Sequence, residues 1–151
     1  MSYSSSDSQQ AVFPAQLASL PGTTAFAQSF CAQHAVSRDD ALRLTLIIEE
    51  LFTNTVTHGY GADCDAEVTL VLTVLDDSVR LLYEDRAPRF DPLARSLSTG
   101  THDVQPLEAR SVGGLGVRLV SALATASRYA YEDGKNRVWI TLKRETGAPR
   151  A

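Results

Sequence analysis

Two stretches in the first part of the chain carry apolar residues every three or four positions, which is the spacing of one helix face. The first covers residues 23–35, because Pro21 and Gly22 interrupt the pattern before it. The second follows Ser37, whose side chain is suited to cap a helix start, and ends at Gly59, a residue type common just after helices. The pattern therefore predicts two consecutive helices.

Strand patterns lie on both sides of these helices. The short apolar run of residues 11–14 ends in a proline and predicts an edge strand. Residues 66–84 hold two runs rich in β-branched side chains around an Asp-Asp turn, which predicts a hairpin. A second hairpin is predicted where the segments RYAYE and RVWITLK flank residues 133–136.

The region between the two hairpins is less regular. Residues 85–92 predict a loop, and residues 93–97 predict a single helical turn. Residues 98–112 have no periodicity, and a loop of this length is commonly either a functional lid or disordered. The glycines of residues 113–116 then precede an apolar helix. Helices in a run beside paired strands favour an α+β fold, a two-layer α/β sandwich with helices on one face of a mixed, mostly antiparallel sheet.

Composition adds the size and the class of the protein. The chain has 151 residues, the length of one domain, which we expect over residues 11–145. Residues 1–10 are polar and predict a disordered tail, and residues 146–151 predict a second short tail. The net charge of −4 argues against direct binding to nucleic acid or to an anionic membrane. With two cysteines and no long apolar stretch, we expect a soluble, cytoplasmic protein.

Glu50 and Asn54 are four residues apart in the second predicted helix, so their side chains leave the same face. A carboxylate and an amide oxygen at this spacing suit a magnesium site beside a general base. The alternative is an ordinary solvated helix face. Apolar neighbours such as Ile47, Ile48 and Leu51 weaken that alternative, because a helix this apolar is packed over much of its surface.

Two further positions have a chemistry that the residues alone leave open. Asp85 ends a predicted strand, where its carboxylate either accepts a hydrogen bond from an exocyclic amine or caps the turn at Ala87 and Pro88. The glycines of residues 113–116 either bring the backbone close to an anion at a helix start or form a flexible loop. They form neither a Walker A motif nor a Rossmann motif.

Three segments, taken together in this order, carry a family resemblance. EELFTNTVTHGY at residues 49–60 is similar to the N box of the histidine-kinase-like ATPase superfamily. DRAPRFDP at 85–92 resembles its first glycine box, and GGLGVRLV at 113–120 resembles its second. The chain looks most like the small bacterial anti-sigma-factor serine kinases, over residues 11–143. This resemblance implies the Bergerat ATP-binding fold and the use of ATP and Mg²⁺.

The resemblance also assigns roles to single residues. It implies Glu50 as the base that activates an attacking hydroxyl, Asn54 as the Mg²⁺ ligand and Asp85 as the adenine contact. Ala87 belongs to the nucleotide site, at a position where the family usually has glycine. Residues 98–112 match the ATP lid. The loop implied to hold the nucleotide phosphates comprises Gly113, Gly114, Leu115, Gly116 and Val117.

The implied function is regulation of transcription by phosphorylation. Members of the family phosphorylate a serine of an anti-anti-sigma partner, a STAS-like protein, and bind a sigma factor when that partner is absent. We therefore expect a protein serine/threonine kinase, and a homodimer is the usual assembly of its relatives. Two alternatives stay open: a non-catalytic module that sequesters a transcription regulator, and a domain that only hydrolyses ATP slowly. Ala87 favours the module, whereas Glu50 and Asn54 oppose it.

Overall fold

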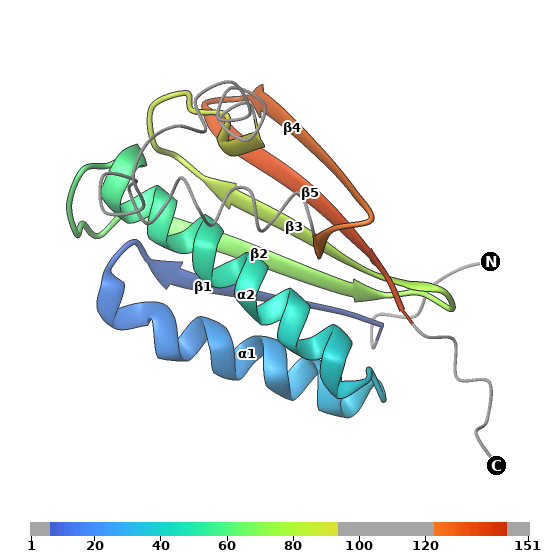
Figure 1. The fold of residues 1–151 in the computed structure, drawn as a ribbon. Coiled ribbons are helices and arrows are strands. Elements are labelled where there is room, and N and C mark those ends of the chain that lie inside the picture. Colours follow the sequence, from blue (N-terminus) through green and yellow to red (C-terminus); the bar gives the residue numbers. More distant parts are fainter. Residues whose placement is uncertain (1–6, 94–122, 145–151) are drawn as a thin grey trace, which may run out of the picture.

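The computed structural model describes residues 7–93 and 123–144. In this part of the chain, two helices lie side by side on one face of a five-stranded sheet, as Figure 1 shows. The predicted two-layer α+β arrangement is therefore confirmed. The predicted lid at 98–112 and the glycine segment at 113–117 lie outside the described residues.

Helix α1, Leu20–Gln33, begins earlier than the predicted residue 23. Pro21 lies in its first turn, where a missing backbone N–H costs no hydrogen bond, so the proline is part of the helix. A short 3-10 turn, Leu17–Ser19, precedes it. The helix also ends before the predicted residue 35, because Ala35 has a positive φ of 55° and turns the chain away.

Helix α2, Arg38–Asn54, begins as predicted. The Ser37 hydroxyl accepts a hydrogen bond of 3.1 Å from the backbone N–H of Asp40 and so caps the first turn. The α-helical winding ends at Asn54, and the chain continues as one π-helical turn, η3, Thr55–Gly59. The helical segment therefore reaches Gly59 as predicted, but its last turn is wider than the sequence pattern indicates. Such π-turns are frequent at functional sites.

The sheet has the strand order β1-β2-β3-β5-β4, and every neighbouring pair among the described strands is antiparallel. The prediction of a mostly antiparallel sheet is therefore confirmed, and the described strands include no parallel pair. Both predicted hairpins are confirmed. The strands are β1, Ser8–Pro14; β2, Glu67–Val74; β3, Ser78–Asp85; β4, Ala126–Glu132; and β5, Lys135–Lys143.

Strand β1 is longer than predicted. It begins at Ser8 and not at residue 11, and Gln10 pairs with Val71 of β2. Residues 8–10 therefore belong to the sheet and not to a disordered tail. These polar residues lack the alternation of apolar and polar side chains that indicates a strand in a sequence. Their place in β1 is evident only from their pairing with β2.

The turn between β4 and β5 is made by Asp133 and Gly134, whose φ angles are 55° and 75°. Two positive φ angles are what a two-residue hairpin turn needs, and the Asp-Gly pair adopts them readily. Strand β5 also pairs with β3, in a register that places Asn136 directly opposite Asp85. Two residues that are far apart in the sequence therefore meet at one end of the sheet.

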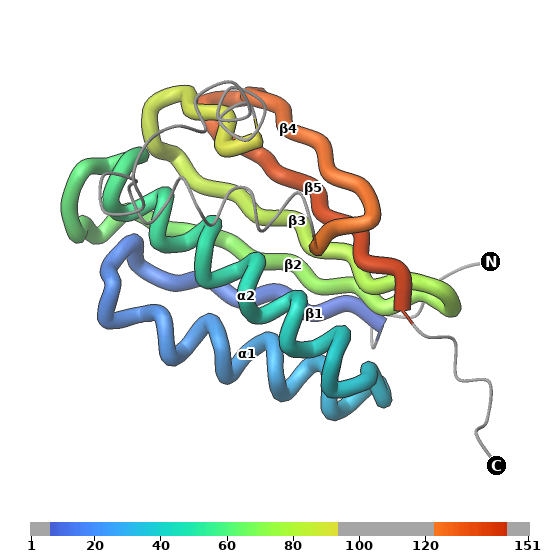
Figure 2. The backbone as a smooth tube through the Cα atoms, in the orientation of Figure 1, coloured from blue at the N-terminus to red at the C-terminus, as the bar shows by residue number. Residues whose placement is uncertain are grey.

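The core lies between the sheet and the two helices, whose backbones run along one face of the strands in Figure 2. Burial of apolar side chains there is the main force that holds the two layers together. No helix in the described ranges is long and apolar enough to cross a membrane. The largest fully buried core side chains include Phe30, Leu44, Ile47, Ile48, Phe52, Leu70, Leu72, Leu81, Ile140 and Leu142.

Candidate functional site

Asn54, the last residue of α2, is buried, and the polar atoms of its side chain lack hydrogen-bond partners among the described residues. Its side chain is only 2% exposed, and neither Oδ1 nor Nδ2 has a hydrogen-bond partner within the described residues. An unpaired buried polar group costs about 1–3 kcal/mol, so folded proteins keep few of them. The amide oxygen is a hard, uncharged ligand of the kind that Mg²⁺ accepts. The residue therefore fits the metal role expected for it.

Glu50 lies one helical turn before Asn54 on α2 and is half-buried. The predicted spacing of the two side chains is kept because the winding stays α-helical as far as Asn54. A carboxylate beside an amide that is suited to a cation can accept a proton from a hydroxyl bound next to it. The geometry is therefore compatible with a general base at Glu50.

Asp85 closes strand β3 and is 6% exposed. Its Oδ1 accepts hydrogen bonds from Asn136 Nδ2 at 2.9 Å and from the backbone N–H of Ala87 at 3.1 Å. Its Oδ2 accepts one from the Thr55 hydroxyl at 2.7 Å. A carboxylate accepts about four hydrogen bonds, so one position on Oδ2 remains for a donor on a ligand. The turn-capping role is confirmed on Oδ1, and Oδ2 keeps room for a ligand contact.

Thr55 and Tyr83 support Asp85, and the sequence analysis missed both. Thr55 is the first residue of η3, and its hydroxyl donates to Asp85 and lies 2.6 Å from the Tyr83 hydroxyl. Tyr83 also donates to the carbonyl oxygen of Leu51 at 3.1 Å. Burial raises the pKa of Tyr83 well above its usual value, and the charge of Asp85 raises it further, so the phenol stays neutral. The one sequence signal for Tyr83 is that it places a hydroxyl at an inward position of a strand whose other inward residues are mainly apolar.

Asn136 is a third residue that the sequence pattern does not single out, because it belongs to residues 133–136, which the pattern indicates only as a hairpin turn. It is 4% exposed and donates to Asp85 and to the carbonyl oxygen of Ala87. Strand β5 therefore contributes a polar side chain to the site, a contribution that the sequence does not predict.

Ala87 occupies the expected glycine position without backbone strain. In the described part of the chain, the non-glycine residues with positive φ are Ala35 and Asp133, and Ala87 is not among them. Its side chain is 1% exposed and packs against Gly59, where an added Cβ would lie 3.0 Å from the Ala87 Cβ. The methyl group therefore fills space beside Asp85 that a glycine would leave open.

These residues enclose a cavity of about 20 Å³, room for roughly one water molecule. Asn54, Thr55 and Asp85 supply polar atoms to its wall. A purine base needs more room than this cavity offers, and Phe90 and Pro92 contribute part of its wall. The other lining residues are Leu51, Gly59, Tyr83, Ala87, Asn136 and Val138.

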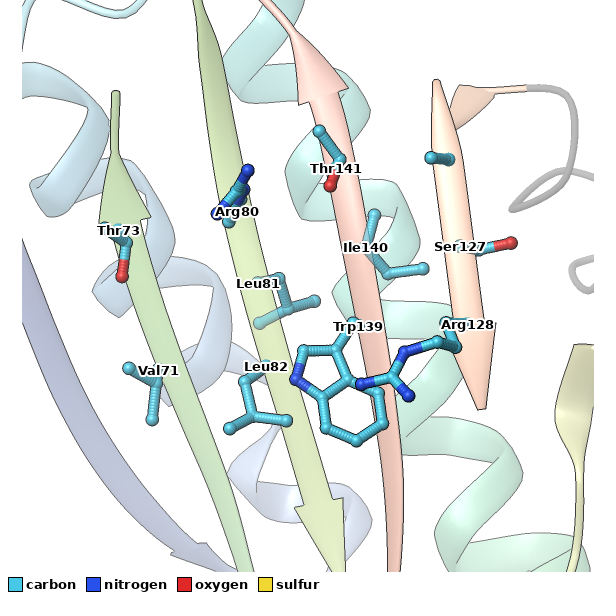
Figure 3. Close-up of a pocket in the computed structure, with 11 residues that line it drawn as sticks. Val71, Thr73, Arg80, Leu81, Leu82, Ser127, Arg128, Trp139, Ile140 and Thr141 are labelled. Atoms are coloured by element: carbon cyan, nitrogen blue, oxygen red, sulfur yellow. The ribbon is translucent and has the colours of Figure 1, made fainter. Parts of the chain in front are cut away.

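A larger cavity, of about 410 Å³, lies on the opposite face of the sheet, over the strands shown in Figure 3. Its side chains Leu82 and Trp139 alternate along their strands with the core residues Leu81 and Ile140, so they point away from the helices. The Arg128 guanidinium stacks on the Trp139 ring, 3.9 Å from the ring centre. No predicted site residue lines this cavity, so it is separate from the Asp85 site.

The residues predicted to hold the nucleotide phosphates lie outside the described part of the chain; they are Gly113, Gly114, Leu115, Gly116 and Val117. The structure therefore brings together Asn54, Asp85 and Ala87, with Glu50 one turn away on α2.

Comparison with known proteins places this arrangement in a family. Residues 13–142 match the histidine kinase-like ATPase domain. A serine-protein kinase RsbW of Listeria monocytogenes is 28% identical over 92 residues, which is 60% of this chain and 59% of that protein. A serine/threonine-protein kinase BtrW of Bordetella bronchiseptica is 29% identical over 131 residues, or 82% of this chain and 88% of that protein. An anti-sigma F factor of Bacillus velezensis is 33% identical over 57 residues, or 38% of this chain and 39% of that protein.

The structural comparison agrees with the sequence match. The crystal structure of the RsbU and RsbW domains of Rv1364c from Mycobacterium tuberculosis superposes with a TM-score of 0.64 at 16% identity. The superposition covers 91% of this chain and 32% of that one, and at this identity it concerns the fold alone. The alignment with the Listeria kinase, in turn, spans 59% of that protein's length. Because the family match extends over most of the sequence, this chain belongs to the histidine kinase-like ATPase domain family.

Proposed function

We propose that this protein binds ATP with Mg²⁺ between α2, η3 and the end of β3, and transfers the γ-phosphate to a serine of a protein partner. The observation that carries the proposal is the buried amide of Asn54, which has no partner within the described residues and lies one turn from Glu50. The relatives named as serine kinases support the transfer reaction.

Asp85 would select the base. The open acceptor position on its Oδ2 suits the exocyclic amine of adenine, and Thr55 holds this oxygen from the other side. Guanine presents a carbonyl oxygen at the corresponding position, which a carboxylate repels. The site therefore favours adenine over guanine.

Asn54 would hold the metal through its amide oxygen, which adds no negative charge next to the phosphates. Mg²⁺ supplies neutralisation of the charge on the transferring phosphoryl group. Backbone N–H groups at a helix start bind phosphate well, and we assign this role to the segment outside the described residues. That segment comprises Gly113, Gly114, Leu115, Gly116 and Val117.

Glu50 would act as the general base. Its carboxylate takes the proton of the partner's serine hydroxyl while the serine oxygen forms a bond to the γ-phosphorus of ATP. The bond between the γ-phosphorus and the bridging oxygen breaks, and ADP leaves with the electron pair. The half-buried place of Glu50 on α2 leaves the residue accessible to a partner side chain.

The names of the relatives suggest the partners. Because relatives are named as anti-sigma factor and serine-protein kinase RsbW, we assign a STAS-like anti-anti-sigma protein as the phosphorylated partner. A sigma factor would be the second partner, bound when the first is absent. We also assign a homodimer as the working assembly.

A second candidate function is a non-catalytic module that binds a transcription regulator. The small cavity and the methyl group of Ala87 favour it, because both restrict the space for a base. This candidate predicts no phosphate transfer, whereas the kinase requires it.

Phosphate transfer is tested with γ-labelled ATP and purified STAS-like proteins from the same organism, and mass spectrometry locates the phosphoserine. Removal of a general base lowers a rate by about 10²–10⁴-fold. Glu50→Ala should therefore bind Mg-ATP like the wild type, and its rate of phosphate transfer should fall by a factor of about 100 or more. Glu49→Ala is the matched control, since Glu49 faces α1 and accepts a hydrogen bond from Thr24. Equal transfer by Glu50→Ala and the wild type would refute the assigned base. Nucleotide binding without transfer by the wild type would favour the non-catalytic module.

A further inference from the structure

Asn136 lies at the point where the β4–β5 hairpin meets the end of β3. It pairs in register with Asp85 and is 4% exposed, although it is only two residues beyond the Asp133-Gly134 turn. Buried asparagines are uncommon unless every polar atom is paired. The contacts of this one side chain therefore show what it holds in place.

The amino group of Asn136 faces three acceptors. Nδ2 lies 2.9 Å from Asp85 Oδ1, 3.0 Å from the Ala87 carbonyl oxygen and 3.2 Å from the Pro88 carbonyl oxygen. Its two hydrogens are shared among these acceptors. The amide therefore ties the carboxylate of Asp85 to the backbone of the turn that follows it.

The carbonyl group of Asn136 faces two donors. Oδ1 accepts from the backbone N–H of Phe90 at 3.0 Å and from the Tyr129 hydroxyl at 2.5 Å. Because acceptors lie on one side and donors on the other, the orientation of the amide is fixed. The side chain therefore connects β4, β5 and residues 87–90 through one rigid group.

This arrangement determines which lone pairs of the Asp85 carboxylate remain available to a ligand. Asn136 and the Ala87 N–H occupy Oδ1, and Thr55 occupies one position on Oδ2. The carboxylate can neither rotate nor turn Oδ1 toward a ligand while these bonds are intact. Only the last position on Oδ2 is left for a hydrogen-bond donor.

We propose that Asn136 is a positioning residue that gives this pocket its selectivity for a 6-aminopurine over purines without a 6-amino group. This inference rests on the proposed binding of ATP. A carboxylate held at one angle accepts a hydrogen bond from a donor at one position and repels a carbonyl oxygen at that position. Without the Asn136 amide, Asp85 can rotate and the turn at 87–90 loses its anchor. The difference in affinity between the two kinds of base should then shrink.

The test compares the binding of ATP, GTP and purine riboside 5′-triphosphate by calorimetry in the presence of Mg²⁺. Purine riboside triphosphate has the shape of ATP without the 6-amino group. A hydrogen bond to a charged group corresponds to roughly tenfold or more in affinity, so the wild type should prefer ATP by about that factor. Asn136→Ala should lose most of this preference by weakening ATP binding, with little change for purine riboside triphosphate.

Ile140→Ala is the matched control, because Ile140 is an inward residue of the same strand, is 1% exposed and does not line the Asp85 cavity. It should destabilise the fold and keep the preference for ATP. Tyr129→Phe is a second variant that removes one bond to Asn136 while the rest of the network stays. It should reduce the preference by a smaller factor, and it gives a result even if Asn136→Ala does not fold.

The possible results separate this inference from the proposed function. A wild type that prefers ATP, together with Asn136→Ala that keeps the same preference, overturns the role of Asn136 and leaves ATP binding intact. If Asn136→Ala does not fold, an unchanged preference in Tyr129→Phe overturns that role. A wild type that binds ATP and purine riboside triphosphate equally, or binds neither, overturns base recognition by Asp85 and this inference with it.

Discussion

Ala87 and Gly59 pack against each other in the wall of the small cavity beside Asp85. The alanine methyl occupies the space that an added Cβ at Gly59 would also need, since the two atoms would lie 3.0 Å apart. The pair therefore sets the width of the pocket. An alanine at residue 87 is acceptable because a glycine stands at residue 59.

The first prediction concerns this pair. Ala87→Gly should raise the affinity for Mg-ATP by up to roughly tenfold, because one methyl group in a tight pocket corresponds to about that factor. Gly59→Ala should have the opposite effect, since its Cβ collides with Ala87. Calorimetric titration of both variants measures the change. Equal affinities in Ala87→Gly and the wild type would show that the methyl group does not limit binding.

The sequence predicts some of the site residues and not others, for a physical reason. Glu50 and Asn54 are predictable because their spacing is a property of one helix. Asp85 is predictable because it ends a strand. Thr55 and Asn136 are not, because each reaches Asp85 only through tertiary structure: the contact of the helical segment with the end of β3 in one case and strand register in the other.

At the scale of elements, the π-turn η3 is the feature that links helix and sheet. It follows Asn54 without a break and aims the Thr55 hydroxyl at the end of β3. Thr55 itself keeps α-helical backbone angles, and the wider winding begins at its carbonyl oxygen, which accepts a hydrogen bond from the Tyr60 N–H at 2.8 Å. The residue at which the winding changes is therefore part of the site.

The second prediction tests this link. Thr55→Val keeps the shape of the side chain and removes the hydroxyl that bonds Asp85 and Tyr83. Loss of a buried hydrogen-bond partner costs about 1–3 kcal/mol, so the free energy of unfolding in urea should fall by that amount. Thr55→Ser keeps the hydroxyl and should retain most of the stability. Equal losses in the two variants would mean that packing, and not the hydroxyl, matters at this position.

Most elements are predictable from the sequence because their signals are local. The cap at Ser37, the Asp-Gly turn and the alternation in β2 and β3 each act within a few residues. Strand β1 is longer than predicted because its polar N-terminal half is held by pairing with β2. The fully antiparallel order of the described strands likewise depends on contacts between distant segments, which local patterns do not contain.

At the scale of the whole molecule, the buried thiol of Cys31 links stability to pH. It is 1% exposed, and burial raises its pKa from 9.0 to about 11, with a further rise caused by Asp40. Because the folded state keeps the thiol protonated, the unfolded state loses its proton first as the pH rises. The stability that this difference provides is complete below pH 9 and is lost progressively as the pH rises through about 11.

The third prediction follows from this fall in stability as the pH rises. Between pH 9 and 11, the free energy of unfolding of the wild type should fall more steeply than that of Cys31→Ala, which has no thiol to titrate. Tyrosines titrate in the same way in both proteins, so the difference between the two curves isolates Cys31. Urea unfolding at a series of pH values gives both curves. Parallel curves would show that the thiol ionises equally in the folded and unfolded states.

The central claim, nucleotide binding beside Asn54, is tested most directly by thermal unfolding with and without Mg-ATP. A ligand at 100 times its Kd stabilises the folded state by about 2.7 kcal/mol, which shifts Tm by roughly 5–10 °C for a domain of this size. The wild type should show this shift with Mg-ATP and Mg-ADP, less with Mg-GTP, and lose it without Mg²⁺.

The same measurement on Asn54→Ala tests whether the Tm shift comes from nucleotide bound at this site. Its amide has no partner within the described residues, so the variant should unfold near the wild-type temperature without nucleotide and show no Mg²⁺-dependent shift. Thr53→Ala, a change at the adjacent residue of α2, should keep the shift. No shift of the wild type at millimolar Mg-ATP, or an equal shift in Asn54→Ala, would contradict the account.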